Sequence, residues 1–179
     1  MKHVLPILVA ASFCMNADAQ EASQQADSFL NIYATTCLKH ISSLDTFRGK
    51  LAALPSLPPE KASQFLNGQQ GKAWPVPDKH GVFVLAIPDG KNLCTVFALR
   101  VNGPEATLRF KRLVATAPPP LNARELQYNN AATPSNGLAN TLAYEWATSG
   151  ANRSLRFILT TANSPSAQIQ GMVSASFGQ

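Results

Sequence analysis

The sequence predicts an α+β fold in which N-terminal helices pack on an antiparallel sheet of about five strands. Three patterns favour this class: apolar residues recur at helical spacing in the first third of the chain, an apolar hairpin follows near the middle, and strict alternation fills the last third. Of the 179 residues, 45% are hydrophobic and 14% charged, which is enough for one core. There is no internal repeat, so we expect a single domain over residues 20–179.

Three helices are expected before the first strand. The first covers residues 26–44, where apolar side chains recur at spacings of three and four along one helix face. These side chains are Leu30, Tyr33, Cys37, Ile41 and Leu44. Asp45 is suited to cap a short second helix over 46–53. A third helix begins at the Pro-Pro-Glu of residues 58–60, because proline is tolerated in the first turn, and Gly68 ends it.

The clearest supersecondary pattern is a β-hairpin. Two apolar runs flank the turn sequence Pro-Asp-Gly-Lys-Asn of residues 88–92, whose glycine suits a positive φ. Residues 82–87 are apolar at every position. This pattern predicts a central strand that is covered on both faces.

A fourth helix and three strands complete the predicted order. Asn102 and Pro104 suit the helix start, and Phe110 belongs to its buried face. Residues 115–137 are poor in apolar side chains, with room for one short strand over 125–129. The order ααα-ββ-α-βββ predicts helices on one face of a five-stranded sheet. Its ββ-α-βββ part matches the element order of PAS- and profilin-like folds.

Residues 1–19 have the pattern of a secretory signal peptide. A short positive start precedes an apolar stretch over residues 4–15 that is too short to span a bilayer. An Ala-x-Ala sequence then ends at Ala19, which is the expected cleavage point. Lipidation of Cys14 is the alternative, and the phenylalanine directly before it argues against a lipid anchor. We expect a periplasmic or secreted protein with no transmembrane span in the mature chain.

Two cysteines remain after that cleavage, Cys37 and Cys94. An even pair in an exported chain is most simply a disulfide. It would join the first helix to the hairpin and stabilise the fold by roughly 4 kcal/mol in the chain-entropy model. The same two cysteines with His40 and His80 are the alternative, a Cys2His2 zinc site, but their spacing fits no standard finger. We expect no metal and no cofactor.

Four features occur together between residues 29 and 114: the spacing of Phe29 and Cys37, the stretches FLNGQQGKAW and GVFVLAIPDGKNLCTVFA, and Phe110 followed by Leu113. In this combination the chain resembles a family of small exported bacterial proteins and lipoproteins of uncharacterised function. The resemblance implies export and a paired Cys37 and Cys94, and it brings no catalytic residues. The chain departs from the lipoproteins of the family because Cys14 lacks a proper lipobox.

Catalysis and nucleic-acid binding are not expected. The sequence has no G-x-S-x-G motif, and only His40 and His80 remain after cleavage as candidate bases. Glu145 has no evident second carboxylate for glycoside cleavage. The net charge of +5 comes without a dense run of Lys and Arg, which argues against a nucleic-acid surface. The protein is predicted not to be an enzyme.

Four side chains are the candidates for a binding site. Arg100, Arg109 and Arg112 form a basic group around the fourth helix that would suit an acidic partner or lipid headgroups, although a solvated helix face gives the same pattern. Trp74 would either line a ligand groove or anchor its loop in the core. We predict an exported, non-enzymatic binding or accessory domain for a protein or small molecule of the envelope. The alternatives are a small-ligand domain with a pocket between helices and sheet, and an enzyme inhibitor.

Overall fold

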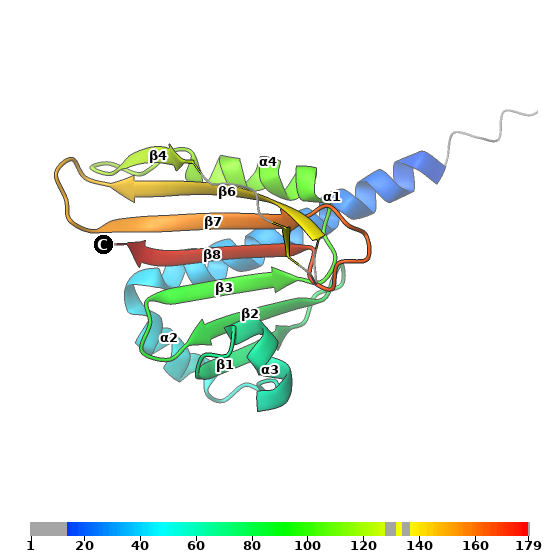
Figure 1. Cartoon of the computed structure of the whole chain (residues 1–179), viewed down its shortest axis with the longest axis horizontal. Helices are drawn as coiled ribbons and strands as arrows, with labels where there is room; N and C mark the ends of the chain where they lie inside the picture. The colour runs from blue at the N-terminus through cyan, green and yellow to red at the C-terminus, as the bar shows by residue number, and fades with distance from the viewer. Residues whose placement is uncertain (1–13, 128–131, 134–136, 179) are drawn as a thin grey trace, which may run out of the picture.

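The computed structural model describes residues 14–127, 132–133 and 137–178, and it confirms the α+β class (Figure 1). The helices are α1 (Cys14–Tyr33), α2 (Leu44–Leu51), α3 (Pro59–Leu66) and α4 (Gly103–Val114). The strands are β1 (Gly71–Val76), β2 (Phe83–Pro88), β3 (Leu93–Ala98), β4 (Asn122–Leu126), β5 (Ala132–Thr133), β6 (Gly137–Ala147), β7 (Ser154–Ala162) and β8 (Gly171–Gly178). All pairings are antiparallel, in the order β1-β2-β3-β8-β7-β6-β4, and β5 pairs with β6.

The prediction of five strands is wrong, because the described residues form an eight-stranded sheet. The strand order on which the PAS- and profilin-like likeness rested changes with it. The sequence pattern does not predict β1, because the strand contains Gly71 and Pro75, which are residues typical of loops. Pro75 is tolerated because β1 is an edge strand. β4, at residues 122–126, begins before the short strand expected at 125–129.

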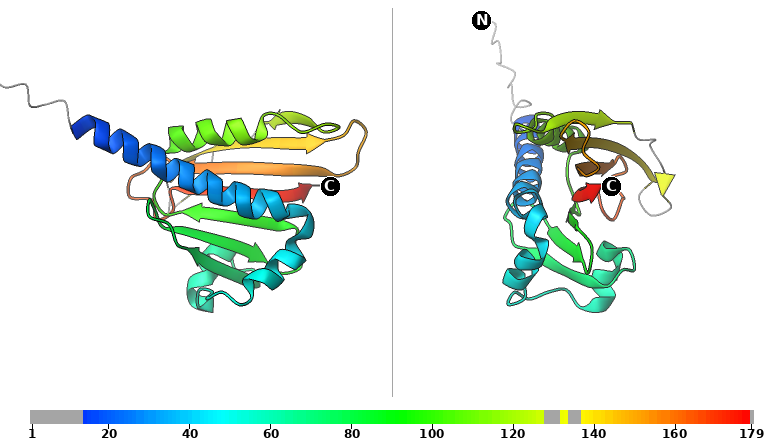
Figure 2. Two further views of the ribbon diagram at one scale, coloured as in Figure 1. Left: turned by 180° about the vertical axis from the view of Figure 1, so that it is seen from behind. Right: turned by 90° about the vertical axis from the view of Figure 1, so that its left-hand side faces the viewer.

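Helices cover both faces of the sheet, so the prediction that they share one face is wrong. On β2, Phe83, Leu85 and Ile87 belong to the core beneath α1, whereas Val84 and Ala86 belong to a second cluster beneath α3. Figures 1 and 2 show α1 and α4 behind the sheet and α3 in front of it. All six residues of β2 are buried, so the expected cover on both faces is confirmed. The strand lies beside edge strand β1 and not at the centre.

The first predicted helix changes form before its end. α1 ends at Tyr33, a π-helical turn follows over Ala34–Leu38, and a 3-10 turn covers Ile41–Ser43. Cys37 lies in the π-helical turn, is fully buried, and forms a disulfide with Cys94 of β3 across a Cα–Cα distance of 5.2 Å. The predicted bond is present, and neither sulfur is free to bind zinc.

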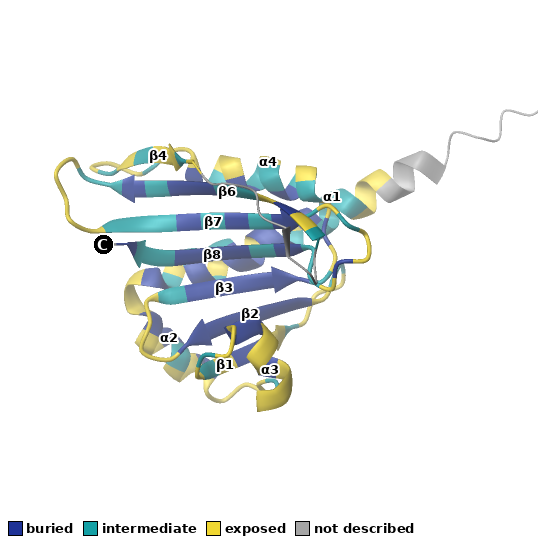
Figure 3. Ribbon diagram, viewed as in Figure 1, coloured by how far each residue is buried: buried dark blue, intermediate teal, exposed yellow. Residues whose placement is uncertain are grey.

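The main core lies between the sheet and the layer of α1 and α4, where the strands in Figure 3 are coloured as buried. Two side chains bond across it. The Tyr33 hydroxyl donates to the Ser174 carbonyl over 3.2 Å, and Trp146 Nε1 donates to the Val114 carbonyl over 2.7 Å. At the start of α4, the Asn102 side chain accepts from the amide of residue 105, which confirms the predicted helix start. Within the described chain, no helix is long and apolar enough to cross a membrane.

Candidate functional site

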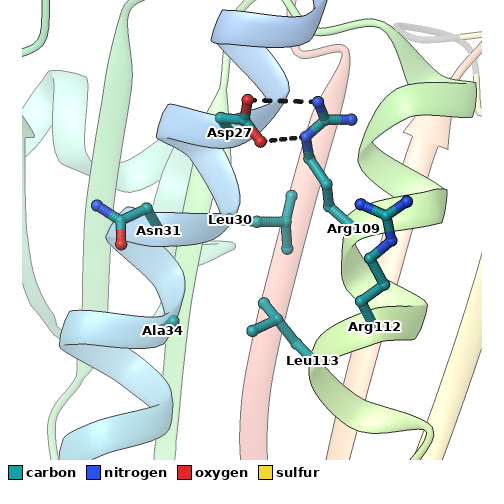
Figure 4. Close-up of a pocket in the computed structure, with 7 residues that line it drawn as sticks. All are labelled: Asp27, Leu30, Asn31, Ala34, Arg109, Arg112 and Leu113. Carbon is teal, nitrogen blue, oxygen red and sulfur yellow. Dashed lines mark hydrogen bonds and ion pairs between the residues drawn. The ribbon is translucent and has the colours of Figure 1, made fainter.

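Two grooves on opposite faces of the sheet are the candidate sites. The first, here the α1–α4 groove, separates α1 from α4 and has a volume of about 270 Å³. Figure 4 shows Leu30 of α1 and Leu113 of α4 facing each other across it. The full lining is Asp27, Leu30, Asn31, Ala34, Arg109, Arg112 and Leu113. The structure therefore brings two of the predicted binding residues, Arg109 and Arg112, to one place.

Arg109 joins the two helices that form this groove. Its Nε and one terminal nitrogen donate to the carboxylate of Asp27 on α1, and the same terminal nitrogen donates to Ser23 Oγ over 2.7 Å. The other terminal nitrogen donates to the carboxylate and, over 3.3 Å, to the carbonyl of Glu105. A guanidinium has five N–H donors, and these contacts use all of them. Arg109 thus has a structural function in the folded chain.

The charges of the groove are only partly compensated. The hydrogen bond from Arg109 holds the pKa of the Asp27 carboxyl below its ordinary value, and the nearby positive charges of Arg109 and Arg112 act in the same direction. Arg112 is exposed, and no hydrogen bond or ion pair within the described residues holds it. Figure 4 shows its guanidinium extending from α4 beside Arg109 with no bond to another labelled residue. It is the cation of this groove with free donors.

The other two predicted binding residues lie elsewhere. Arg100 follows β3 and donates to the carbonyls of Leu99 and Ala167 over 2.6 and 2.9 Å. It lines a polar hollow of about 540 Å³ next to the start of α4. Trp74 is 4% exposed and belongs to the main core, with no hydrogen-bond partner for its Nε1 among the described residues. Its indole therefore anchors β1, as the core interpretation predicts.

The second groove, here the α3 groove, lies on the opposite face of the sheet and has a volume of about 400 Å³. The sequence does not predict this groove, because the groove exists only where α3 covers the front of the sheet. The register places Phe97 of β3 opposite Met172 of β8, which in turn lies opposite Thr160 of β7. The lining is Gln64, Phe65, Asn67, Phe97, Ala139, Thr160, Ala162, Ile169, Gly171 and Met172. None of these side chains is charged.

The carboxylate of Glu145 is held by contacts with neighbouring side chains. It accepts hydrogen bonds from Arg124 over 2.9 Å and from Ser154 over 3.0 Å, and Arg156 lies 3.5 Å away. The bond from Arg124 is the main cause that lowers the pKa of its carboxyl, with further contributions from Ser154 and Arg156. A glycosidase acid needs a raised pKa, so Glu145 is held in the form that cannot donate a proton.

His40 and His80 lie in different surroundings. His40 stacks on Phe47 with ring centroids 4.3 Å apart. The backbone amide of His80 donates to Asp78 Oδ1 over 2.7 Å in the loop before β2. Among the described residues, no group of three His, Cys, Asp or Glu side chains is placed to hold a metal ion. No family model, curated protein or solved structure matches the chain, so the two grooves are the basis for assigning a function.

Proposed function

We propose that the protein is an exported, non-enzymatic binding or accessory domain whose ligand occupies the α3 groove. The observation that carries this proposal is the groove itself. Its volume of about 400 Å³ falls within the range of about 300–1,000 Å³ for small-molecule sites. Its position between a helix and the sheet favours the small-ligand alternative, although the groove lies on the face away from the Trp74 core.

The lining indicates the class of ligand. Phe65 and Phe97 meet edge to face with ring centroids 5.2 Å apart, and Met172 and Ile169 add further apolar surface. The amide of Gln64 is one of a few polar groups at this site. A charged ligand group would lose its hydration here without an opposite charge to replace it. We therefore expect a neutral, largely apolar ligand.

The placement of α1 supports export. Figures 1 and 2 show α1 projecting from the body toward its N-terminus. Ala19 and Gln20 are exposed, whereas Ser23 bonds to α4 and Ala26 is fully buried. Cleavage after Ala19 would therefore leave both of these packed residues in place. The buried disulfide suits an oxidising compartment, and the resemblance to small exported bacterial proteins belongs to the same proposal.

The ligand proposal is tested with N-phenylnaphthylamine, an uncharged apolar probe whose fluorescence rises in an apolar site. Wild-type protein should bind it saturably. Ala162→Phe fills the groove and should abolish binding, because Ala162 is part of the lining. Ala115→Phe is the matched control, since Ala115 is exposed at the end of α4, and it should bind as wild type does. Equal binding by both variants, at unchanged thermal midpoints, would contradict the proposal.

A further inference from the structure

We infer that the α1–α4 groove is a second binding surface, which docks an acidic amphipathic helix of a partner protein through a carboxylate on Arg112. This surface lies on the face of the sheet away from the α3 groove. It goes beyond the proposed ligand site and does not depend on it. Four features of the groove support the inference: its walls, its rigidity, its charges and its backbone.

The walls have the shape that a third helix requires. Leu30 of α1 lies one helical turn before Ala34, which begins the π-helical turn after α1, and Leu113 faces them from α4. The small side chain of Ala34 leaves the hollow of about 270 Å³ into which an apolar side chain of another helix can insert. Amphipathic helices bind such grooves through apolar residues spaced three or four apart.

The groove is already formed in the free protein. Arg109 of α4 holds α1 through its bonds to Asp27 and Ser23, and its remaining donors are bound to Glu105 of its own helix. Leu30 is only 3% exposed, and Phe110 on the underside of α4 is fully buried in the main core. Because the two helices are fixed, a partner would not have to order them on binding, which lowers the free-energy cost of association.

The charges select an acidic partner. The one carboxylate that lines the groove, that of Asp27, already accepts hydrogen bonds from Arg109, as does the carboxylate of Glu105 nearby on α4. Arg112 keeps its donors free, and its neighbour Lys111 is also exposed. A carboxylate can receive two parallel hydrogen bonds from a guanidinium, and such charge-assisted bonds are stronger than neutral ones. A lysine of a partner would instead face an uncompensated arginine.

The backbone favours a helix over an added strand. The amides and carbonyls within α1 and α4 bond inside their own helices. The groove therefore has no free sheet edge for strand addition. Side-chain insertion with one anchoring charge remains as the mode of binding, and an amphipathic helix provides both.

The test uses two synthetic amphipathic helical peptides that share a leucine face and differ only in carrying Glu or Lys beside it. Binding to the mature full-length chain is measured by fluorescence anisotropy at low salt. The Glu peptide should bind about tenfold more tightly, a difference of about 1.4 kcal/mol. Arg112→Glu should reverse this preference. The matched control Lys111→Glu alters an exposed residue of the same turn outside the groove lining, and the Glu peptide should still bind more tightly.

Further outcomes distinguish helix docking from membrane binding. Ala34→Phe fills the hollow and should weaken both peptides. Equal affinity for the two peptides, or the same reversal by Lys111→Glu, would overturn the inference. A third outcome would also contradict helix docking: wild type binds phosphatidylglycerol vesicles, Arg112→Glu abolishes this vesicle binding, and neither peptide binds. In that case Arg112 contacts a membrane surface, and the inference of helix docking is wrong. Unchanged thermal midpoints show that each variant is folded, which is expected because Arg112 makes no bond within the described residues.

Discussion

At the scale of single residues, the two arginines of α4 differ in what they contact. Both belong to the basic group that the sequence indicates, and the sequence also places Glu105 one helical turn before Arg109. The contact with Asp27 could not be predicted, because it joins residues 82 positions apart. That contact makes Arg109 structural and leaves Arg112 as the available cation. The roles of Arg109 and Arg112 can be distinguished only from the packing of α1 against α4 in the folded structure.

Replacing Arg109 should destabilise the fold. Arg109→Met keeps the apolar stem but leaves Asp27 and Glu105 without their shared donor, at a cost of about 1 kcal/mol because both carboxylates are solvent-exposed. Arg112→Met, the matched control, should change the free energy of unfolding by less than about 0.5 kcal/mol. Urea unfolding at neutral pH measures both. Equal stability of the two variants would contradict the structural role of Arg109.

The same pair should contribute a pH dependence. Arg109 depresses the pKa of Asp27 below its ordinary value of 3.8 in the folded state. The stability that this provides is present above the unfolded pKa and is lost as the pH falls through the folded pKa. The stability gap between wild type and Arg109→Met should therefore narrow below about pH 4. The effect is small, because the Asp27 side chain is 64% exposed and solvent screens the pair.

At the scale of elements, local patterns predict the hairpin well and the edges of the sheet poorly. β2 and β3 lie where two apolar runs flank an Asp-Gly turn, and Gly90 has the positive φ that this turn needs. β1 escapes prediction because an edge strand tolerates Pro75. The sequence also does not predict that α3 lies on the front face. Every residue of β2 is apolar, so the pattern does not indicate which face of the sheet a helix covers. Because the position of α3 is not predicted, the α3 groove is not predicted either.

The disulfide should be the main covalent contribution to stability. Cys37 and Cys94 are 57 residues apart, and closing such a loop is worth roughly 4 kcal/mol in the chain-entropy model. The double variant Cys37→Ala/Cys94→Ala should lose about this much in urea unfolding. Both sulfurs are fully buried, so mild reductant should leave the folded protein oxidised. Finding two free thiols in the unreduced, denatured protein would refute the bond.

At the scale of the whole molecule, the chain presents two different grooves, one on each face of the sheet. The α3 groove is uncharged, whereas the α1–α4 groove carries a free arginine at its rim. Composition and charge could predict one domain with a modest positive charge, but not this division. It arises from register and helix placement, which bring together residues that are far apart in the sequence.

The proposed export makes a prediction about the N-terminus of the processed protein. Mass spectrometry of protein recovered from the envelope or medium should show a chain that begins at Gln20, because the Ala-x-Ala sequence ends at Ala19 and the packed part of α1 begins beyond it. A variant with Ala19→Arg should stay uncleaved. Recovery of a chain that begins at a lipid-modified Cys14 would contradict signal-peptide removal at this position.

The most direct test of the ligand proposal is an amide NMR titration of the mature protein with N-phenylnaphthylamine. We predict saturable shifts that cluster at Phe65, Phe97 and Met172, around the α3 groove. Shifts at Leu30 and Leu113, across the sheet, should be absent. Saturable shifts confined to the α1–α4 groove, or none at any residue, would contradict the account.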